Sequence, residues 1–343
     1  MEMVQLSHPH SARTTDAPEG AREALERALL RFAVGSRLDR AGLMATEHLA
    51  SGGKRVRGRL ALASCALWGI SDEEAVPWAA AVELLHNATL VHDDIQDGDE
   101  FRRGRPTVWA RHGVSQAINT GDLLLMLPWL AVAEIPAPEK VRFRLSVSVA
   151  DRAQRTVRGQ VDEMELLGSR KLDRGSYLRA SSGKTGHLLA LPVEGAALLA
   201  GRSQDAARRL AAPFEALGLL FQLQDDLVDL YGEKGREAPG GDLREGKVSA
   251  LVVTHLERVP ADRDWLLRIL DAPRLETRAS DVQEASRRFS NSGAVASVLS
   301  WIDELAARIV RAPELEDEPR LQALAASMCD VVLAPVSHLR SHL

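Results

Sequence analysis

The sequence predicts an all-α fold, and three observations carry that prediction. Aromatic residues make up only 4% of the 343 residues, whereas Ala, Leu, Glu and Arg are abundant, and this composition favours helices over strands. Apolar residues recur at helical spacing from Ala21 onward, and no segment shows convincing alternation of apolar and polar residues. Segments containing Gly and Pro interrupt these patterns, as they do between helices. We therefore expect a bundle of roughly ten or more helices.

The expected elements can be placed in order along the chain. Residues 1–20 are polar and include two prolines, so a disordered tail is expected there. Helical apolar spacing begins with Leu25 and Leu29, and another strong stretch starts near Val82. The predicted breaks between helices are Gly52–Gly53, Gly69–Pro77, Gly98–Pro106, Pro136–Pro138, Gly168–Gly175, Gly232–Gly246 and Pro313–Pro319. No long linker or solenoid repeat divides the chain, so residues 21–343 are predicted to form a single domain.

Charge and cysteine usage exclude several classes of protein. The 43 basic and 48 acidic residues give a net charge of -5, so there is no basic surplus for a nucleic-acid partner. Cys65 and Cys329 lie in apolar segments without metal-binding spacing, which favours buried thiols in a reducing cytoplasm. The longest apolar run, from Leu123 to Ala133, is too short to cross a bilayer. We expect a cytoplasmic protein without a transmembrane segment.

Two acidic clusters lie on predicted helices. In the first, Asp93 and Asp97 are four residues apart and share a helix face, with Asp94 beside them. A solvated acidic surface is one explanation, but the residues before this cluster are apolar, and buried like charges need a cationic partner.

The second cluster favours a functional site over a solvated acidic surface, because it repeats the same spacing after another apolar helix. It contains Asp225, Asp226 and Asp229. Two facing helices of this kind would supply only hard oxygen ligands, which suit Mg²⁺ completed by water and substrate phosphates. The pair of clusters therefore predicts phosphate chemistry.

Basic residues occur in several separated segments that would complement phosphates. They are Lys54, Arg55, Arg57, Arg102, Arg103, Arg105, Lys184, Arg244 and Lys247. Any one of these segments alone is more typical of a solvated loop than of a ligand site. A phosphate-binding loop is rejected at Gly183-Lys184-Thr185, because position 178 is Leu where that motif requires Gly and no strand pattern precedes it.

Taken together, these motifs resemble the trans-isoprenyl (polyprenyl) diphosphate synthases over nearly the whole chain from Ala21. The matching segments are GGKRxR at 52–57, LLHNATLVHDD with His86, the aspartate motif at 93–97, RRGxPT at 102–107, AINxGD at 117–122, GQ at 159–160, KT at 184–185 and FQxxDDxxD at 221–229. The resemblance implies an isoprenoid-synthase-type helical bundle around a central cavity, in a homodimer. It also implies condensation of an allylic diphosphate with isopentenyl diphosphate.

The resemblance assigns roles to these positions. About three Mg²⁺ ions would be held by Asp93, Asp97 and Asp225, with Asp94, Asp226 and Asp229 in support. The allylic diphosphate would meet Arg102, Lys184 and Lys247, with Thr185 and Gln222 near its head. The residues implied for isopentenyl diphosphate are Lys54, Arg57, His86 and Arg103.

The sequence also departs from the family pattern at several positions. Gly58 stands where Pro is common, a change expected to affect loop stiffness more than binding. The segment 235–242 lacks the usual Gly-Lys pair, and Arg236 is a candidate replacement.

In this family, residues one and two turns before the first aspartate motif line the tunnel for the growing chain. Here they are Val82, Leu85, Ala88 and Thr89. The small Ala88 and Thr89 predict a geranylgeranyl product or a longer polyprenyl chain, although Met126 and Trp129 could close the tunnel deeper down. A class I terpene synthase and a catalytically silent partner subunit are the remaining alternatives; the second aspartate motif and the basic residues, which are all present, argue against both.

Overall fold

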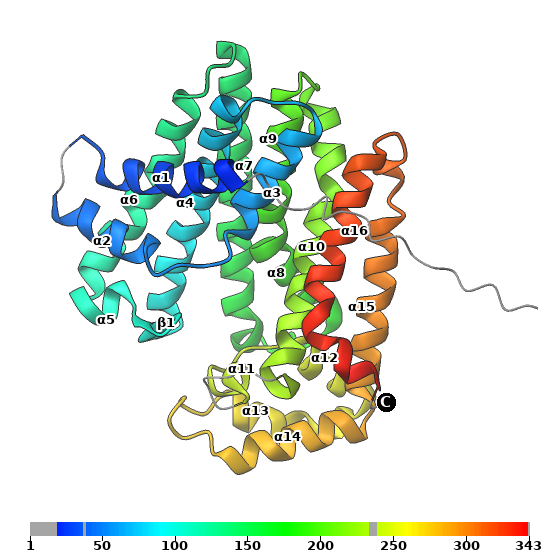
Figure 1. The fold of residues 1–343 in the computed structure, drawn as a ribbon. Helices are drawn as coiled ribbons and strands as arrows, with labels where there is room; N and C mark the ends of the chain where they lie inside the picture. Colours follow the sequence, from blue (N-terminus) through cyan, green and yellow to red (C-terminus); the bar gives the residue numbers. More distant parts are fainter. Residues whose placement is uncertain (1–18, 37–38, 233–238, 342–343) are drawn as a thin grey trace, which may run out of the picture.

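The computed structural model describes residues 19–36, 39–232 and 239–341, and most of them are helical (Figure 1). The α-helices are α1 (Glu19–Val34), α2 (Arg40–Leu49), α3 (Val56–Leu67), α4 (Asp72–Gln96), α5 (Val108–His112), α6 (Val114–Ala133), α7 (Glu139–Gly168), α8 (Arg174–Ser181), α9 (His187–Leu199), α10 (Gln204–Tyr231), α11 (Gly241–Arg244), α12 (Ala250–Arg258), α13 (Arg263–Leu270), α14 (Ala279–Asn291), α15 (Ala294–Val310) and α16 (Pro319–Leu333). The predicted all-α fold is confirmed. Of the tail expected over residues 1–20, residues 1–18 lie outside the described part, and α1 begins at Glu19.

Short helical turns of other types connect these helices. A π-helical turn, η1, covers Ser182–Gly186, and three 3₁₀ segments are η2 (Pro260–Asp262), η3 (Pro313–Leu315) and η4 (Ala334–Ser341). A π-turn inside a longer helical run is often found at a functional site. Here it carries the Lys184-Thr185 pair.

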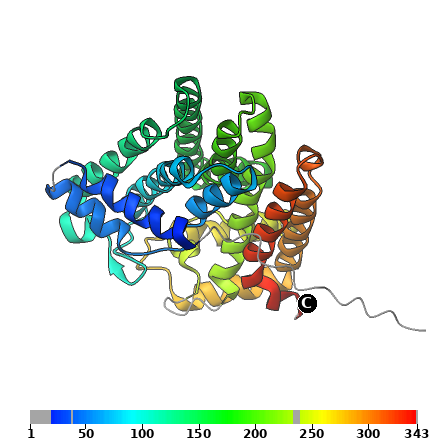
Figure 2. The ribbon, with the colours of Figure 1, turned by 45° about the horizontal axis from the view of Figure 1, so that its top comes forward.

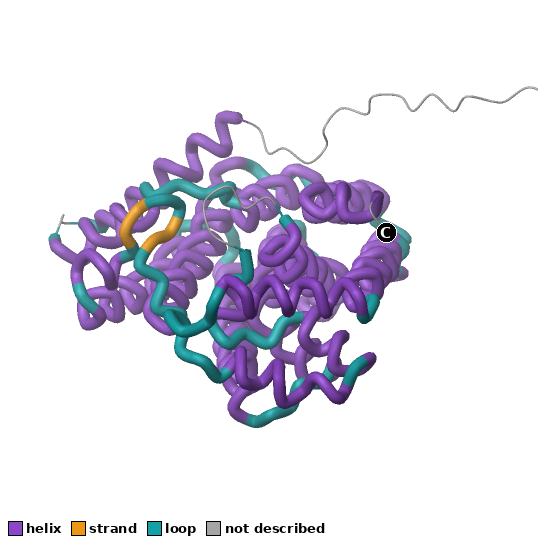
Figure 3. Tube along the Cα trace, turned by 90° about the horizontal axis from the view of Figure 1, so that it is seen from below, coloured by secondary structure: helices purple, strands orange, loops and turns teal. Residues whose placement is uncertain are grey.

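A small hairpin lies in the segment Gly98–Pro106, where the sequence predicts only a break between helices. Strands β1 (Phe101–Arg102) and β2 (Arg105–Pro106) pair antiparallel, with Arg102 opposite Arg105 (Figure 3, orange). Each strand has two residues, too few to produce an alternating pattern. The hairpin fixes the directions of two consecutive arginines directly after α4.

One predicted break, Gly69–Pro77, ends too late. Helix α4 begins at Asp72 and continues through Pro77. Proline removes the hydrogen bond to the carbonyl four residues earlier, which here belongs to Glu73. Because Glu73 is exposed in the first turn of the helix, its carbonyl can bind water instead.

The bundle brings the ends of α4 and α10 to one end of the molecule. Helix α4 packs against α6 and α3, while α10 packs against α9 and α15 (Figures 1 and 2). The hairpin, α11 and α13 lie at the lower end in Figure 1. Large side chains that fill the interior include Trp78, Tyr177, Phe214 and Phe289. The two aspartate motifs occupy the last turns of α4 and α10 and therefore meet at that end.

One helical segment, Pro319–Arg340, is long and apolar enough to cross a membrane by length and composition. Of its apolar 18-residue window, 39% is buried inside the protein. The side chains of Leu321, Leu324 and Cys329 face the core. A single partly buried helix of this kind is weak evidence for a membrane span, because core helices of soluble proteins have the same composition.

Candidate active site

A direct ion pair joins the end of α4 to the segment that follows α11, and the first amides of α11 in turn donate to Asp229 of the second cluster. Lys247 Nζ, in the segment after α11, lies 2.9 Å from Asp97 Oδ2 at the end of α4. Burial acts to lower the pKa of Lys247, but the carboxylates of Asp97 and Glu245 raise it above its usual value. Lys247 therefore stays charged and joins segments 150 positions apart.

Asp93 lies in an environment that disfavours its negative charge. Burial raises the pKa of Asp93, and the nearby carboxylates of Asp97 and Glu163 raise it further, while Lys184 opposes them. Lys184 Nζ itself lies 2.5 Å from Glu163 Oε2. A cation added between Asp93 and Asp97 would relieve this repulsion, as expected of metal ligands.

Asp94 has a different partner. Its Oδ1 accepts a hydrogen bond of 2.6 Å from Arg102 Nε in the hairpin, and its side chain is 1% exposed. Burial raises the pKa of Asp94 to about 6, although Arg102 acts in the opposite direction. Asp94 thus connects α4 to the hairpin and fixes the position of Arg102.

Two aspartates of the second cluster accept hydrogen bonds from backbone amides and from side chains. Asp226 accepts from the amide of Ala250 at 2.6 Å, from the Tyr177 hydroxyl at 2.8 Å and from Gln222 Nε2 at 2.9 Å. Even so, burial raises the pKa of Asp226 to about 7. Asp229 accepts from two amides of α11, at 3.1 and 3.2 Å. Asp225 is partly exposed between them.

Sequence reasoning missed two acidic residues at this site. Burial and the charges of Asp229 and Asp226 raise the pKa of Asp242 well above its usual value. Glu163, the partner of Lys184, was also unassigned. No local sequence pattern indicates that α11, which carries Asp242, folds back onto α10. For Glu163, its place one turn after the GQ pair was the available signal.

Basic side chains from the start of α3 and from the hairpin lie around His86 of α4, and this group is named the basic pocket. Arg57 Nη1 is 3.0 Å from His86 Nε2, and burial lowers the pKa of Arg57 to about 10. Burial and the charge of Arg57 lower the pKa of His86 well below its usual value, so the ring is neutral. A guanidinium only donates, so Nε2 accepts and Nδ1 carries the proton. That N–H is buried and has no hydrogen-bond partner among the described residues.

The loop before α3 brings Arg103 to the same pocket. Gly53 has φ +132°, and a Cβ there would lie 2.6 Å from Arg103 Cζ, so only glycine leaves room for the guanidinium. Arg103 donates to the carbonyl of Gly52. Arg55 anchors the loop through Glu26, at 2.8 Å, whereas Lys54 is exposed. The four residues predicted for isopentenyl diphosphate therefore come from α4, the hairpin, the start of α3 and the loop before it.

Gly58 belongs to α3 and not to a loop, so its expected effect on loop stiffness does not apply. Its amide donates to Glu83 Oε1 at 2.8 Å, and an added Cβ would lie 2.6 Å from Glu83 Cγ. Proline has no amide hydrogen and would leave this buried carboxylate without that donor. Glu83 favours the charged form of Arg57. Having Gly rather than Pro at position 58 therefore affects the basic pocket through Glu83.

The predicted tunnel residues lie on α4, which packs along α6. Val82, Leu85 and Ala88 are buried, and Thr89 is partly buried. Met126 is 54% exposed on the outside of α6, so it cannot close a tunnel inside the bundle. Trp129 is partly buried against the core.

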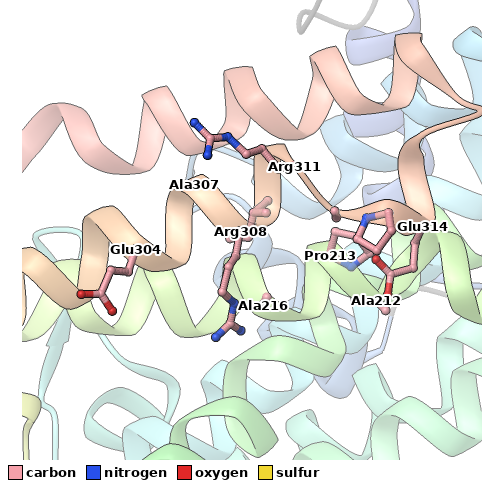
Figure 4. Close-up of a pocket in the computed structure, with 11 residues that line it drawn as sticks. Ala212, Pro213, Ala216, Glu304, Ala307, Arg308, Arg311 and Glu314 are labelled. Atoms are coloured by element: carbon pink, nitrogen blue, oxygen red, sulfur yellow. The ribbon is translucent and has the colours of Figure 1, made fainter.

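Two cavities are also present, one away from these clusters and one bordered by the first cluster. One of about 470 Å³ lies between α10 and α15 and is lined by Pro213, Arg308 and neighbours, none of which was predicted as a site residue (Figure 4). Another of about 440 Å³ lies between α2 and α5, with Asp94 and Arg102 in its wall. Arg236 lies outside the described residues.

Comparison with known proteins identifies the chain. The polyprenyl synthetase family model matches residues 42–288, which include both aspartate motifs and the basic loop. The chain belongs to the polyprenyl synthetase family.

Relatives of this polyprenyl synthetase make the class of reaction specific. The short chain isoprenyl diphosphate synthase of Methanocaldococcus jannaschii is 37% identical over 230 residues, 66% of this chain and 70% of that protein. The geranylgeranyl diphosphate synthase of Mycobacterium tuberculosis is 35% identical over 286 residues, 81% of this chain and 80% of that protein. A crystal structure of geranylgeranyl pyrophosphate synthetase from Pyrococcus horikoshii is 26% identical, with a TM-score of 0.81 over 94% of this chain and 97% of that one. This polyprenyl synthetase is a prenyltransferase with the predicted isoprenoid-synthase-type bundle.

Proposed function

We propose that this polyprenyl synthetase condenses an allylic diphosphate with isopentenyl diphosphate to give geranylgeranyl diphosphate and pyrophosphate. The main support is that acidic and basic side chains form separate groups at one end of the bundle. Two acidic clusters meet through Lys247 and Asp97, and a separate basic pocket contains Arg57 and His86. One diphosphate needs metal ions between the clusters, and the other is bound by the basic side chains directly.

The acidic site fits Mg²⁺. Membership of the family implies Mg²⁺-dependent catalysis in general. Within residues 19–36, 39–232 and 239–341, no three His, Cys, Asp or Glu side chains are already arranged to hold an ion. Ions held by Asp93, Asp97 and Asp225 would take their remaining oxygens from water and the diphosphate, as Mg²⁺ commonly does. Bound there, about three ions would stabilise the negative charge that develops on the leaving pyrophosphate.

The remaining aspartates support this site. Asp94 holds Arg102, and Asp226 and Asp229 hold Gln222 and α11 in place. Arg102, Lys184 and Lys247 would contact the diphosphate oxygens, with Thr185 and Gln222 beside them. Cations positioned before the C–O bond breaks lower the cost of charge separation.

The basic pocket orients the second substrate. The guanidinium groups of Arg57 and Arg103, the ammonium of Lys54 and the Nδ1–H of His86 would bind the diphosphate of isopentenyl diphosphate. This holds its double bond toward the allylic cation formed beside Asp93. The proton lost afterwards can leave with pyrophosphate, so the proposal requires no side-chain base.

One assay tests the reaction. Purified protein is supplied with Mg²⁺, an allylic diphosphate and isopentenyl diphosphate, and the products are identified by mass. Elongated diphosphates that need isopentenyl diphosphate support the proposal. Hydrocarbon made without it would indicate a terpene synthase, and no product would indicate a silent subunit.

Product length is tested at Ala88. The relative named geranylgeranyl diphosphate synthase supports this product, and a longer polyprenyl chain is the second candidate. Ala88→Phe should shorten the product, because an aromatic ring there blocks the tunnel. Ala80→Phe, at another fully buried position of α4, controls for overpacking. Unchanged product length in Ala88→Phe would contradict the tunnel assignment.

We also propose a homodimer formed through an apolar face of α6 and α7. Large exposed side chains recur at helical spacing there: Ile118, Met126, Leu130, Phe143, Val147, Val157, Val161 and Met164. A face of this kind is typical of an interface between subunits. Sedimentation of the native protein should give a dimer, and Phe143→Glu together with Met164→Glu should give a monomer.

A cytoplasmic location and a single domain over residues 21–343 complete the proposal. Both are supported by the packing of α16, the one candidate span in the described residues, against α15 and α10. Fractionation of cells expressing the protein should recover it without detergent.

A further inference from the structure

A closed ring of charged groups joins the end of α4 to the segment after α11. Lys247 Nζ lies 2.9 Å from Asp97 Oδ2 and 2.7 Å from Glu245 Oε2. Arg274 completes the ring: its Nη2 is 3.2 Å from Glu245 Oε1, and its Nη1 is 3.3 Å from the Asp97 carbonyl and 3.0 Å from Asp99 Oδ1. Arg274 has no role in the site proposed above.

The position of Arg274 in the chain explains what the ring connects. It lies between α13 and α14, 175 positions after Asp99. Gly246 has φ +70°, and a Cβ there would lie 2.6 Å from the carbonyl of Leu270, so the segment after α11 rests directly on the end of α13. Arg274 therefore reaches from this supported unit to the end of α4.

The charges around Arg274 would repel one another without it. Asp97, Asp99 and Glu245 are negative, with side chains 18%, 28% and 13% exposed, and Lys247 is the other positive member of the ring. Charges that are partly buried are screened less by salt than exposed ones. The planar guanidinium can contact two carboxylates and a carbonyl at once, which a lysine ammonium on a flexible chain does less well.

We propose that Arg274 is a positioning residue that sets the separation of the two acidic clusters and keeps Lys247 directed into the cleft between them. This rests on the proposed function, because the consequence is correct binding of metal ions and the allylic diphosphate. A metal ion that binds the carboxylate of Asp97 removes one partner of Lys247. Glu245, held by Arg274, then keeps the ammonium at the cleft.

The first test uses the metal-free protein and needs no activity. Arg274→Ala is compared with Arg170→Ala, because Arg170 pairs with Asp271 at 2.9 Å and has similar exposure, 47% against 43%. Amide hydrogen exchange in residues 97–103 and 241–248 should become several-fold faster in Arg274→Ala and stay unchanged in Arg170→Ala. Equal exchange in the two variants would overturn the proposal.

The second test separates positioning from general destabilisation. In the prenyl-transfer assay, Arg274→Ala should raise the half-saturating Mg²⁺ concentration roughly three- to tenfold, while the KM for isopentenyl diphosphate changes less than about twofold. The half-saturating Mg²⁺ concentration of Arg274→Lys should lie between those of native protein and Arg274→Ala. Adding Asp99→Asn to Arg274→Ala should raise that concentration little further. An equal rise in both constants would show a non-specific loss. If native protein and Arg170→Ala transfer no prenyl group, the proposed function fails, and hydrogen exchange still decides the role of Arg274.

Discussion

The two aspartate clusters share one motif, but they are held by different kinds of partner. At the end of α4, Asp97 and Asp94 are paired with Lys247 and Arg102, which are side chains from distant segments. At the end of α10, Asp226 and Asp229 accept hydrogen bonds from the backbone amides of Ala250 and α11, and Asp226 also accepts from the side chains of Tyr177 and Gln222. A metal ion can displace a lysine without unfolding anything. A backbone amide cannot leave without disturbing the helix to which it belongs.

This difference indicates a division of labour between the clusters. We expect cations to exchange at the first cluster, and we expect the second cluster to act as a fixed wall that includes Asp225. A motif of five residues therefore does not determine what each of its carboxylates does. Four predictions would break or sharpen the comparison.

The largest effect is expected from Asp93→Asn. Removing one electrostatic contact of a preorganised site should lower kcat about 10²–10³-fold. Because burial and neighbouring carboxylates raise the pKa of Asp93, the neutral amide should leave the free energy of unfolding unchanged or higher. Steady-state kinetics and urea unfolding measure the two quantities. A large loss of stability in Asp93→Asn would show that Asp93 holds the fold together, and the proposed difference between the two clusters would be wrong.

Mg²⁺ itself should act through the first cluster. A ligand at about 100 times its Kd stabilises the folded state by about 2.7 kcal/mol. Thermal unfolding in Mg²⁺ with pyrophosphate, compared with EDTA, should show such a gain in native protein and most of it lost in Asp93→Asn. Asp226→Asn supplies the contrast, since it leaves the first cluster intact and should still respond to Mg²⁺. Equal responses of both variants would contradict the proposed division.

The sequence predicted the helical fold and the two acidic helices because helical periodicity and aspartate spacing are local patterns. It did not predict β1 and β2, whose two-residue strands leave no pattern, or the helix through Pro77. At the site, the resemblance supplied the basic residues around His86. The roles of Asp242 and Arg274 could not be predicted, because they arise when α11 and α13 fold back onto α10 and α4.

The stability of the metal-free protein should depend on pH through Asp226. Burial raises its pKa from 3.8 to about 7 in the folded protein. Between these values the folded state binds more protons than the unfolded state, so the free energy of unfolding contributed by this group falls as pH rises. Urea midpoints at pH 5 and pH 8 in EDTA should show that fall in native protein and a flatter profile in Asp226→Asn. If the urea midpoint of Asp226→Asn fell with pH as steeply as that of native protein, other groups would be responsible for the pH dependence.

The smallest expected effect is a difference in stability between two tyrosine variants. The chain has two tyrosines, of which only Tyr177 contacts the second cluster, so the pair separates support of that cluster from ordinary helix packing. Tyr177 donates to the buried carboxylate of Asp226, while Tyr231, on the same helix as Asp226, donates to the carbonyl of Ser286 at 2.8 Å. Hydrogen bonds to charged groups contribute about 1.5–3 kcal/mol and neutral ones about 1 kcal/mol. Tyr177→Phe should therefore destabilise more than Tyr231→Phe in urea unfolding, and both should retain kcat within about threefold. If Tyr177→Phe lowered kcat as far as Asp93→Asn, Asp226 would be acting on the substrate through its own charge, and the second cluster would be as exchangeable as the first.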